Sequence, residues 1–435
     1  MSTSGEVAAR QTEDLSATVL LVALGISLFV PSLAFIPVFG DDFDQLVFVR
    51  HLENPLSVLW SSWWGAYPYY RPLHTLLLWS SERVFGVAWW PNQLFSLLLH
   101  LANTVLLFRL ARRYRAGVEL SFGISAFYLV SIHVVKTVTW VAARSDLLVG
   151  MFLLLLVLHI ARREDQGRRL DVWVVALLTI GALMSKESGV VVPLLAAIAA
   201  TRFRSFVRSD IRILVVVGIL LLTYTAMRVA IFGVFAEDPV YETRPVLLLG
   251  GRDLTSLPPT LENKMVGYGE NFGKYLAAQI VPVFSEQGLP LPAKRLATQS
   301  PLWILVPVIF VAAVRRRMPR QQQLGLSVIV LCAFVHSSFY ATYLLYLGHI
   351  GLCLFLAVDP APRPRILGKK GILVAYVSVI LVSMIHSGRH QVGGLVSQRV
   401  ALERWVLEGP PEGAEPELAA LLLERYGARP RMRNR

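Results

Sequence analysis

Three carboxylates lie within four residues in the segment Gly40-Asp41-Asp42-Phe43-Asp44. Carboxylates this close raise one another's pKa, because each negative charge disfavours ionisation of the next. A carboxylate with a raised pKa can accept a proton from a hydroxyl group near neutral pH. The segment therefore contains two candidate general bases, Asp41 and Asp42. The alternative, that an exposed loop simply carries acidic residues, stays open.

Aromatic rings follow the acidic segment and end at a guanidinium group, that of Arg71. The rings belong to Trp60, Trp63, Trp64, Tyr67, Tyr69 and Tyr70. Guanidinium presents a fixed fork of donors, so Arg71 is suited to hold a phosphate. The rings could stack against a sugar, but aromatic residues also form belts at membrane interfaces. Both interpretations remain open.

Two further segments place cations beside acids. One runs from Lys136 to Asp146 and contains Trp140 and Arg144, and the other is Ser185-Lys186-Glu187-Ser188. Ionisable residues that flank apolar runs on one side indicate a polar cavity for an anionic lipid head group. Alternatively, Arg144 with Asp146, and Lys186 with Glu187, are neighbouring charges that only neutralise each other. His100 and Asn103, within an apolar run, are expected to hydrogen-bond between helices.

Composition defines the setting of these residues. Of 435 residues, 55% are hydrophobic and 16% are charged, whereas soluble domains carry roughly one quarter charged residues. The mean hydropathy is +0.55, and the apolar residues fall into runs near the roughly 20 residues that cross a bilayer. The chain is therefore predicted to be an all-α polytopic integral membrane protein. Its two cysteines, Cys332 and Cys353, lie inside apolar runs and offer neither a disulfide framework nor a cysteine-based metal site.

The net charge of +13 comes from short basic clusters between apolar runs. This is the pattern of cytoplasmic loops and not that of a nucleic-acid binding face. Using these clusters as cytoplasmic markers, we predict about 11 transmembrane helices. They cover about 18–38, 92–110, 118–135, 145–161, 172–184, 188–200, 213–232, 301–314, 324–340, 342–357 and 372–385.

The segments outside these spans complete the predicted organisation. Residues 1–17 are cytoplasmic, and 18–387 form the multispan domain. A long external loop, 39–90, carries the acidic segment and, in 72–90, helices at the interface. A second external region, 233–300, includes the apolar run 272–284, which is short for a crossing, and 388–435 form an external tail. Asp41, Arg71, Arg144 and Lys186 then all face the external side.

Five segments together resemble the GT-C class of multispan glycosyltransferases, in particular the membrane part of the tetratricopeptide-containing O-mannosyltransferases and their bacterial relatives. They are Asp41-Asp42, Tyr70-Arg71-Pro72-Leu73, Leu97 to Asn103, Trp140 with Arg144 and Asp146-Leu147-Leu148, and Leu183 to Glu187, with a weaker sixth at Tyr346 to Gly351. Their order and spacing cover residues 35 to 355.

The resemblance implies transfer of a sugar from a polyprenyl- or dolichyl-phosphate donor to a glycan, lipid or protein hydroxyl, with inversion. Asp41 would be the base, with Asp42 beside it. Arg71, Arg144 and Lys186 would stabilise the leaving phosphate, supported by Tyr70, Trp140, Asp146 and Glu187. We expect no cofactor, no nucleic acid partner, and a place in a bacterial inner membrane as part of the cell envelope machinery.

The sequence also departs from its relatives. Lys136 stands where they usually carry an acid, and Thr342-Tyr343 where they often carry Glu-Arg. There is no tetratricopeptide array, so a protein acceptor recognised through one cannot be assumed. Acids in the second external region could supply another acid or a metal ligand, although loop solvation explains them as well. They are Glu237, Asp238, Glu242, Asp253 and Glu262.

Two other classes of function remain. A transporter or flippase of lipid-linked sugars would need charges across the bilayer midplane and often internal repeats, and the sequence shows neither. The other class is a non-catalytic membrane scaffold or a degenerate relative of the family, and the Lys136 departure is the feature that supports it.

Overall fold

The computed structural model describes residues 3–36, 41–61, 69–114, 116–201, 208–232, 275, 319–335, 345–357, 369–408 and 416–426. Every regular element in these ranges is an α-helix or a short 3-10 helix. The predicted all-α class is therefore confirmed.

The described helices follow one another along the chain in this order. The first are α1 (Thr3–Phe29), η1 (Val30–Ala34), α2 (Asp41–Arg50), η2 (Pro55–Leu59), α3 (Pro72–Phe85), α4 (Trp90–Arg113), α5 (Val118–Val130) and α6 (Ile132–Thr139). Then come η3 (Val141–Ala143), α7 (Arg144–Asp165), α8 (Val172–Ser185), η4 (Glu187–Val190), α9 (Val191–Thr201) and α10 (Arg208–Phe232). The last are α15 (Arg320–Val335), α16 (Leu345–Leu356), α17 (Lys369–Glu408) and α18 (Pro416–Tyr426).

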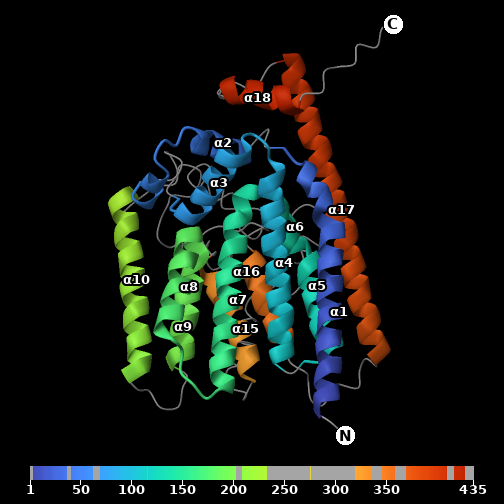
Figure 1. Cartoon of the computed structure of the whole chain (residues 1–435), viewed down its shortest axis with the longest axis vertical. Helices are drawn as coiled ribbons and strands as arrows, with labels where there is room; N and C mark the ends of the chain where they lie inside the picture. Colours follow the sequence, from blue (N-terminus) through green and yellow to red (C-terminus); the bar gives the residue numbers. More distant parts are fainter. Residues whose placement is uncertain are drawn as a thin grey trace, which may run out of the picture.

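Most of the long helices stand side by side along one axis, and α2, α3 and α18 lie at one end of this bundle (Figure 1). By length and composition, four helices could cross a membrane, over Ala8–Ala34, Trp90–Arg113, Val141–Asp165 and Ile211–Ile231. Five shorter apolar helices accompany them. The predicted number of 11 spans stays a prediction, because several of its segments, 301–314 among them, lie outside the described residues.

One predicted span is two helices. The chain turns at Ser131, whose backbone is extended, so that α5 ends at Val130 and α6 begins at Ile132. The predicted single crossing over 118–135 is corrected accordingly.

The two ends of the bundle differ in charge. Arg112 and Arg113 end α4 and Arg163 lies near the end of α7, at the same end of the bundle as the start of α1 (Figure 1). Ion pairs join this end, among them Arg112 to Asp14 at 2.7 Å and Arg113 to Asp165 at 2.9 Å. The acidic start of α2 lies at the opposite end. Which end faces the cytoplasm stays a prediction.

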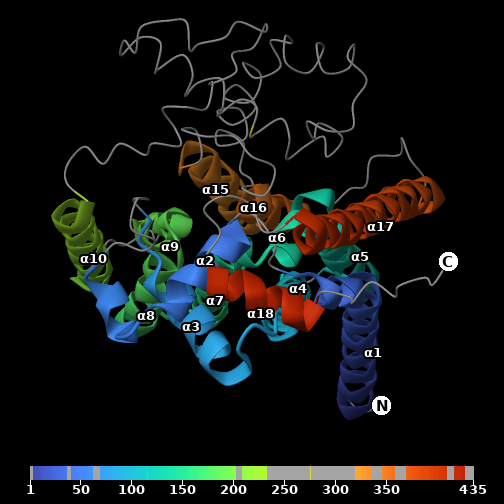
Figure 2. The same ribbon diagram turned by 90° about the horizontal axis from the view of Figure 1, so that it is seen from above.

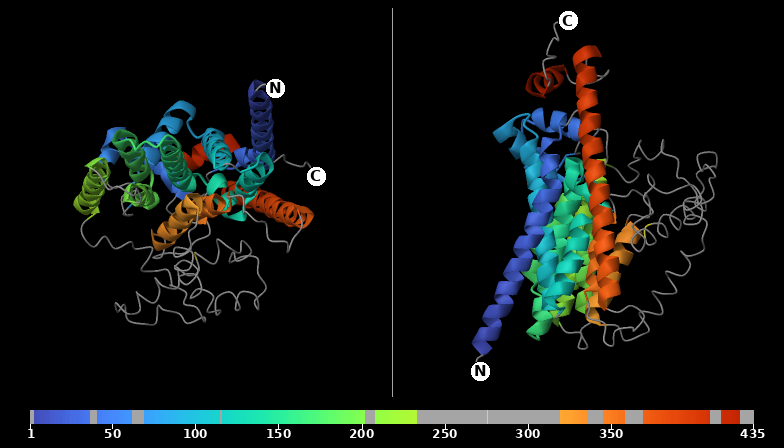
Figure 3. Two further views of the ribbon diagram at one scale, coloured as in Figure 1. Left: turned by 90° about the horizontal axis from the view of Figure 1, so that it is seen from below. Right: turned by 90° about the vertical axis from the view of Figure 1, so that its right-hand side faces the viewer.

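The helix that contains the last predicted span is longer than that span. α17 runs through 40 residues without a break to Glu408, so the helix continues beyond Ser387, where the span was predicted to end. In the side view it rises along the bundle past the level of α2, and α18 lies beside its far end (Figure 3). The helical stretch predicted near 415–426 is confirmed as α18.

Buried polar side chains link the long helices inside the bundle. Asn103 of α4 donates to the Leu147 carbonyl of α7 and to the Tyr346 hydroxyl of α16, both at 2.9 Å. His100 bonds to the Leu129 carbonyl of α5 at 3.1 Å. The predicted interhelical role of His100 and Asn103 is thus confirmed.

Candidate active site

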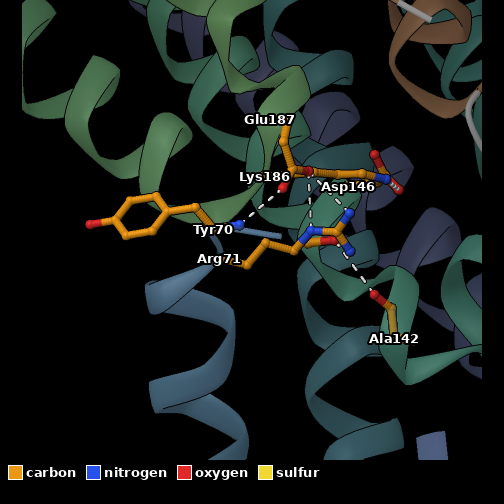
Figure 4. A network of polar contacts seen from close by, with 7 residues as sticks. Tyr70, Arg71, Ala142, Asp146, Lys186 and Glu187 are labelled. Carbon is orange, nitrogen blue, oxygen red and sulfur yellow. Dashed lines mark hydrogen bonds and ion pairs between the residues drawn. The ribbon is translucent and has the colours of Figure 1, made fainter. Parts of the chain in front are cut away.

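Glu187 joins two segments that are far apart in the sequence. Its Oε1 accepts the Tyr70 backbone N–H at 3.2 Å, and its Oε2 accepts Arg71 Nε at 3.2 Å and Nη2 at 3.0 Å. Figure 4 shows Arg71 and the Tyr70 nitrogen directed at this carboxylate. The loop that leads into α3 is therefore docked on the turn between α8 and η4.

That turn is tight because of Gly189. A Cβ atom at this position would lie 2.1 Å from the Ala182 carbonyl oxygen, so a side chain would force the backbones apart. Lys186 ends α8 in an extended conformation. The turn thereby presents Lys186 and Glu187 together at the end of the bundle.

Lys186 and Asp146 form a second ion pair, with Nζ and Oδ2 only 2.6 Å apart. Both side chains are buried, at 7% and 1% exposure. The two ion pairs thus link the turn between α8 and η4 to two other segments. Lys186 pairs with Asp146 of α7, and Glu187 pairs with Arg71, the residue before α3. The alternative in which sequence neighbours neutralise each other is wrong about the partners.

Arg144, the first residue of α7, is held by neutral groups. Its Nη2 donates to the Asn92 carbonyl at 3.0 Å and to Asn92 Oδ1 at 2.9 Å, and its Nε to Ser96 Oγ at 3.3 Å. The residue is 1% exposed and forms no ion pair within the described residues. A buried charge without a salt bridge is costly, and an anion that approached would lower this cost. The Arg144 guanidinium can therefore attract an anion nearby.

Asp42 is buried and fixed, whereas Asp41 is half-buried. The Asp42 Oδ1 accepts the Ala142 N–H at 2.8 Å, which ties α2 to η3. Burial raises the pKa of Asp42 to about 7 and the Asp41 charge adds to the rise, while the Ala142 and Val141 N–H groups and Arg144 oppose it. The two predicted acids therefore differ in the structure: Asp42 is buried and hydrogen-bonded to η3, and Asp41 is more accessible.

Sequence reasoning missed His74, which sits among the predicted cations. Its Nε2 bonds to Gln45 Oε1 at 3.0 Å, so α3 is tied to α2. Burial holds the His74 pKa well below its ordinary value, and the charges of Arg144, Arg71 and Lys186 lower it further. All three predicted cations thus act on one imidazole. Its position one helical turn after Arg71 was the signal that could have drawn attention to it.

The aromatic residues have mixed roles. Tyr70 is buried, donates its hydroxyl to the Leu59 carbonyl at 2.9 Å and packs against Tyr224, and its ring points away from the network (Figure 4). The Arg71 guanidinium lies 4.3 Å from the Tyr69 ring centre. The Lys136 ammonium lies 4.7 Å from the ring centre of Trp140. Trp63, Trp64 and Tyr67 lie outside the described residues.

No group of three or more His, Cys, Asp or Glu residues that could hold a metal ion occurs in the described part of the chain. The acids between Glu237 and Glu262 lie outside it.

Residues 68–227 match the family described as dolichyl-phosphate-mannose-protein mannosyltransferase. The matched segment includes every predicted site residue except Asp41 and Asp42. The predicted resemblance to GT-C glycosyltransferases is therefore confirmed, as is the assignment to an integral membrane protein.

A crystal structure of ArnT from Cupriavidus metallidurans, bound to undecaprenyl phosphate, is similar to this chain. The similarity covers 94% of this chain and 72% of that one, with 15% sequence identity and a TM-score of 0.45. No curated protein matches the sequence.

Proposed function

We propose that this GT-C glycosyltransferase moves a sugar, mannose in the first instance, from a polyprenyl-phosphate donor to an acceptor hydroxyl on the external face of the membrane. One observation carries the proposal most directly: the three cations Arg71, Arg144 and Lys186 all act on His74, which bonds to Gln45 of α2, and Arg144 also acts on Asp42 at the acidic start of that helix. A base for the acceptor and positive charge for a leaving phosphate are the two things the reaction needs.

In the proposed step, the acceptor oxygen attacks the anomeric carbon from the side opposite the phosphate. The acceptor proton passes to an aspartate. The bond between the anomeric carbon and the phosphate oxygen breaks, and its electron pair stays on the polyprenyl phosphate. Attack from the opposite side inverts the anomeric configuration.

Asp41 is the base in this proposal. Asp42 is buried, whereas Asp41 is only half-buried at the first position of α2 and is therefore the more accessible of the two to a substrate. Asp42 fixes the start of α2 and therefore positions its neighbour. The positive end of the α2 dipole stabilises both carboxylates.

Arg71 and Arg144 differ in burial, and we assign them different roles on that basis. The Arg71 side chain is 12% exposed, so an incoming phosphate would meet it first. Arg144 lies beneath and acts through its charge, which no carboxylate in the described part of the chain neutralises by direct contact. Removing one preorganised donor of this kind typically lowers the rate by about 10²–10³.

The test is transfer from undecaprenyl-phosphate mannose, measured as released undecaprenyl phosphate, with membrane extract as the source of acceptor. We expect Asp41→Asn to lower the rate at least about a thousandfold at normal expression, and Asp42→Asn to lower it substantially. Glu53→Gln, an exposed acid just after α2, is the matched control. An unchanged rate in Asp41→Asn would remove the proposed base.

The sugar and the acceptor can be identified in cells. Mass spectrometry of surface glycans and glycoproteins from a deletion strain should show one missing sugar. If all surface sugars are instead retained while a lipid-linked sugar accumulates on the cytoplasmic side, the chain is a flippase and the transferase proposal fails.

A further inference from the structure

The C-terminal half of α17 reaches the candidate active site. Trp405 packs against Phe43, the residue directly after Asp42, with ring centres 5.6 Å apart and planes at 89°. Edge-to-face aromatic contacts of this geometry are favourable beyond the area that they bury. A residue near the end of the chain therefore contacts the helix turn that carries both acids.

This contact belongs to a compact apolar cluster, separate from the core of the bundle. Its buried members are Ile36, Phe43, Leu46, Val49, Leu78, Val87, Trp89, Val141, Leu402, Trp405, Ala419 and Leu422. Four of them belong to α17 and α18, and the others belong to α2, α3, η3 and the segments just before α2 and just after α3. Seen from above, α18 lies across this end of the bundle next to α2, α3 and α4 (Figure 2).

Polar contacts fix the register of the same packing. Gln398 Oε1 accepts the Ile36 N–H at 3.0 Å, just before the segment that leads into α2. The Tyr426 hydroxyl accepts the Trp89 N–H at 3.0 Å and donates to the Val87 carbonyl at 3.1 Å. The C-terminal helices are thus bonded to chain segments on both sides of α2 and α3.

We propose that Trp405 is a positioning residue for the transfer reaction, which holds the acidic start of α2 in place through Phe43. The inference rests on the proposed function of Asp41 and Asp42. α2 has 10 residues, which is too short to be stable by itself in water. Its opposite face is held by the Asp42 bond to Ala142 and the Gln45 bond to His74. Without Trp405, α2 would keep those bonds but lose the ring that packs against Phe43 next to the acids.

The experiment compares full-length variants. Trp405→Ala should lower kcat for release of undecaprenyl phosphate from undecaprenyl-phosphate mannose at least tenfold. The Kd for undecaprenyl phosphate should change less than threefold, because Arg71, Arg144 and Lys186 are untouched. Trp405→Phe keeps an aromatic ring against Phe43 and should recover most of the rate. Leu407→Ala is the control, since Leu407 is on the same helix and 80% exposed.

Hydrogen exchange gives a readout that does not depend on the reaction. Exchange of residues 41–50 should become at least tenfold faster in Trp405→Ala, with α4 and α7 unchanged. If Trp405→Ala does not fold, Tyr426→Phe, which removes one hydroxyl, should loosen 41–50 in the same way.

Unchanged exchange over 41–50, or a normal kcat in folded Trp405→Ala, would overturn the inference. If Asp41→Asn is fully active while 41–50 still loosens, the proposed base is wrong and the packing role of Trp405 stands.

Discussion

At the scale of single residues, the site pairs two of its buried cations with carboxylates and holds the third through neutral groups. Glu187 neutralises Arg71 and Asp146 neutralises Lys186. Among the described residues, Arg144 donates hydrogen bonds only to neutral groups, although its charge interacts with that of Asp42. A phosphate entering this network would find ordered side chains and a guanidinium that is not ion-paired with any described carboxylate, which reduces the reorganisation that binding requires.

The pKa of Asp42, raised to about 7, gives a pH dependence with two opposite signs. Transfer should need the ionised pair, so the rate should fall about tenfold per pH unit as pH drops below 7 and should level off above about 8. Stability follows the reverse course, because an acid whose pKa is raised by folding favours the folded state below that pKa. Thermal stability in detergent should decrease as pH rises through 7. Rates and melting temperatures between pH 5.5 and 8.5 measure both.

Asp42→Asn should remove both dependences. His74 stays neutral over this range, because its pKa lies well below its ordinary value, so it should not contribute. If the rate is flat from pH 5.5 to 8.5 in the wild type, the acid pair does not act as proposed.

The Lys186 and Asp146 pair can be separated into structural and functional parts by a double-mutant cycle. Lys186→Met and Asp146→Asn should each destabilise the protein by about 3–5 kcal/mol, because each leaves a buried charge unpaired. The double variant should regain stability. It should remain at least a hundredfold slower in transfer, because the phosphate has lost a cation.

The partly exposed pair of Arg113 and Asp165 at the opposite end is the control. Its variants should change stability by less than about 1 kcal/mol and leave the rate unchanged. A double variant of Lys186 and Asp146 that transfers at the wild-type rate would make that pair purely structural.

At the scale of elements, hydropathy predicts helices well but not where they end. Apolar runs located α4, α7, α8 and α10 because long apolar stretches have few alternatives to a helix in lipid. The apolar run over 372–385 ends near Ser387, but this point marks only a change in composition and not the end of the helix. Residues 388–408 contain no proline and are rich in helix formers, so α17 continues. The turn at Ser131 was missed because both its flanks are apolar.

The candidate site was predictable in its members but not in its contacts. Asp41, Arg71, Arg144 and Lys186 stood out because they flank apolar runs on the side opposite the basic clusters. Their partners depend on how distant segments fold together, and the sequence carries no spacing signal for that. Trp405 and His74 escaped notice because an aromatic or a histidine in a helix usually indicates ordinary packing.

Close contact between α15 and α16 depends on two glycines. A Cβ at Gly325 would lie 2.5 Å from the Phe355 nitrogen and 2.6 Å from the Gly351 carbonyl oxygen. Small residues allow membrane helices to approach this closely. Gly325→Ala should therefore destabilise the protein by about 1–3 kcal/mol, measured by thermal unfolding in detergent. Gly218→Ala on α10, where no atom lies within 4 Å, should have little effect, and equal stability of the two variants would contradict the packing argument.

At the scale of the whole molecule, the chain separates its chemistry from its basic loops. The acids of α2 and the ion-paired cations lie at one end, with α18 across it, and the arginines in the last turns of α4 and α7 lie at the other (Figure 1). A lipid donor in the bilayer would then present its phosphate at a single membrane surface. This polarity makes the orientation of the molecule testable without knowledge of the substrate.

Cysteine labelling should place the site end outside the cell. Ser80 on α3 and Gln166 after α7 are both exposed and lie at opposite ends of the bundle. Each is replaced by cysteine in a chain whose buried Cys332 and Cys353 are changed to alanine. An impermeant maleimide should label Ser80→Cys in intact cells and Gln166→Cys only after the membrane is opened, because arginine-rich loops are retained in the cytoplasm. The reverse pattern would put Asp41 and Arg71 on the cytoplasmic side, where the proposed acceptor on the external face could not be reached.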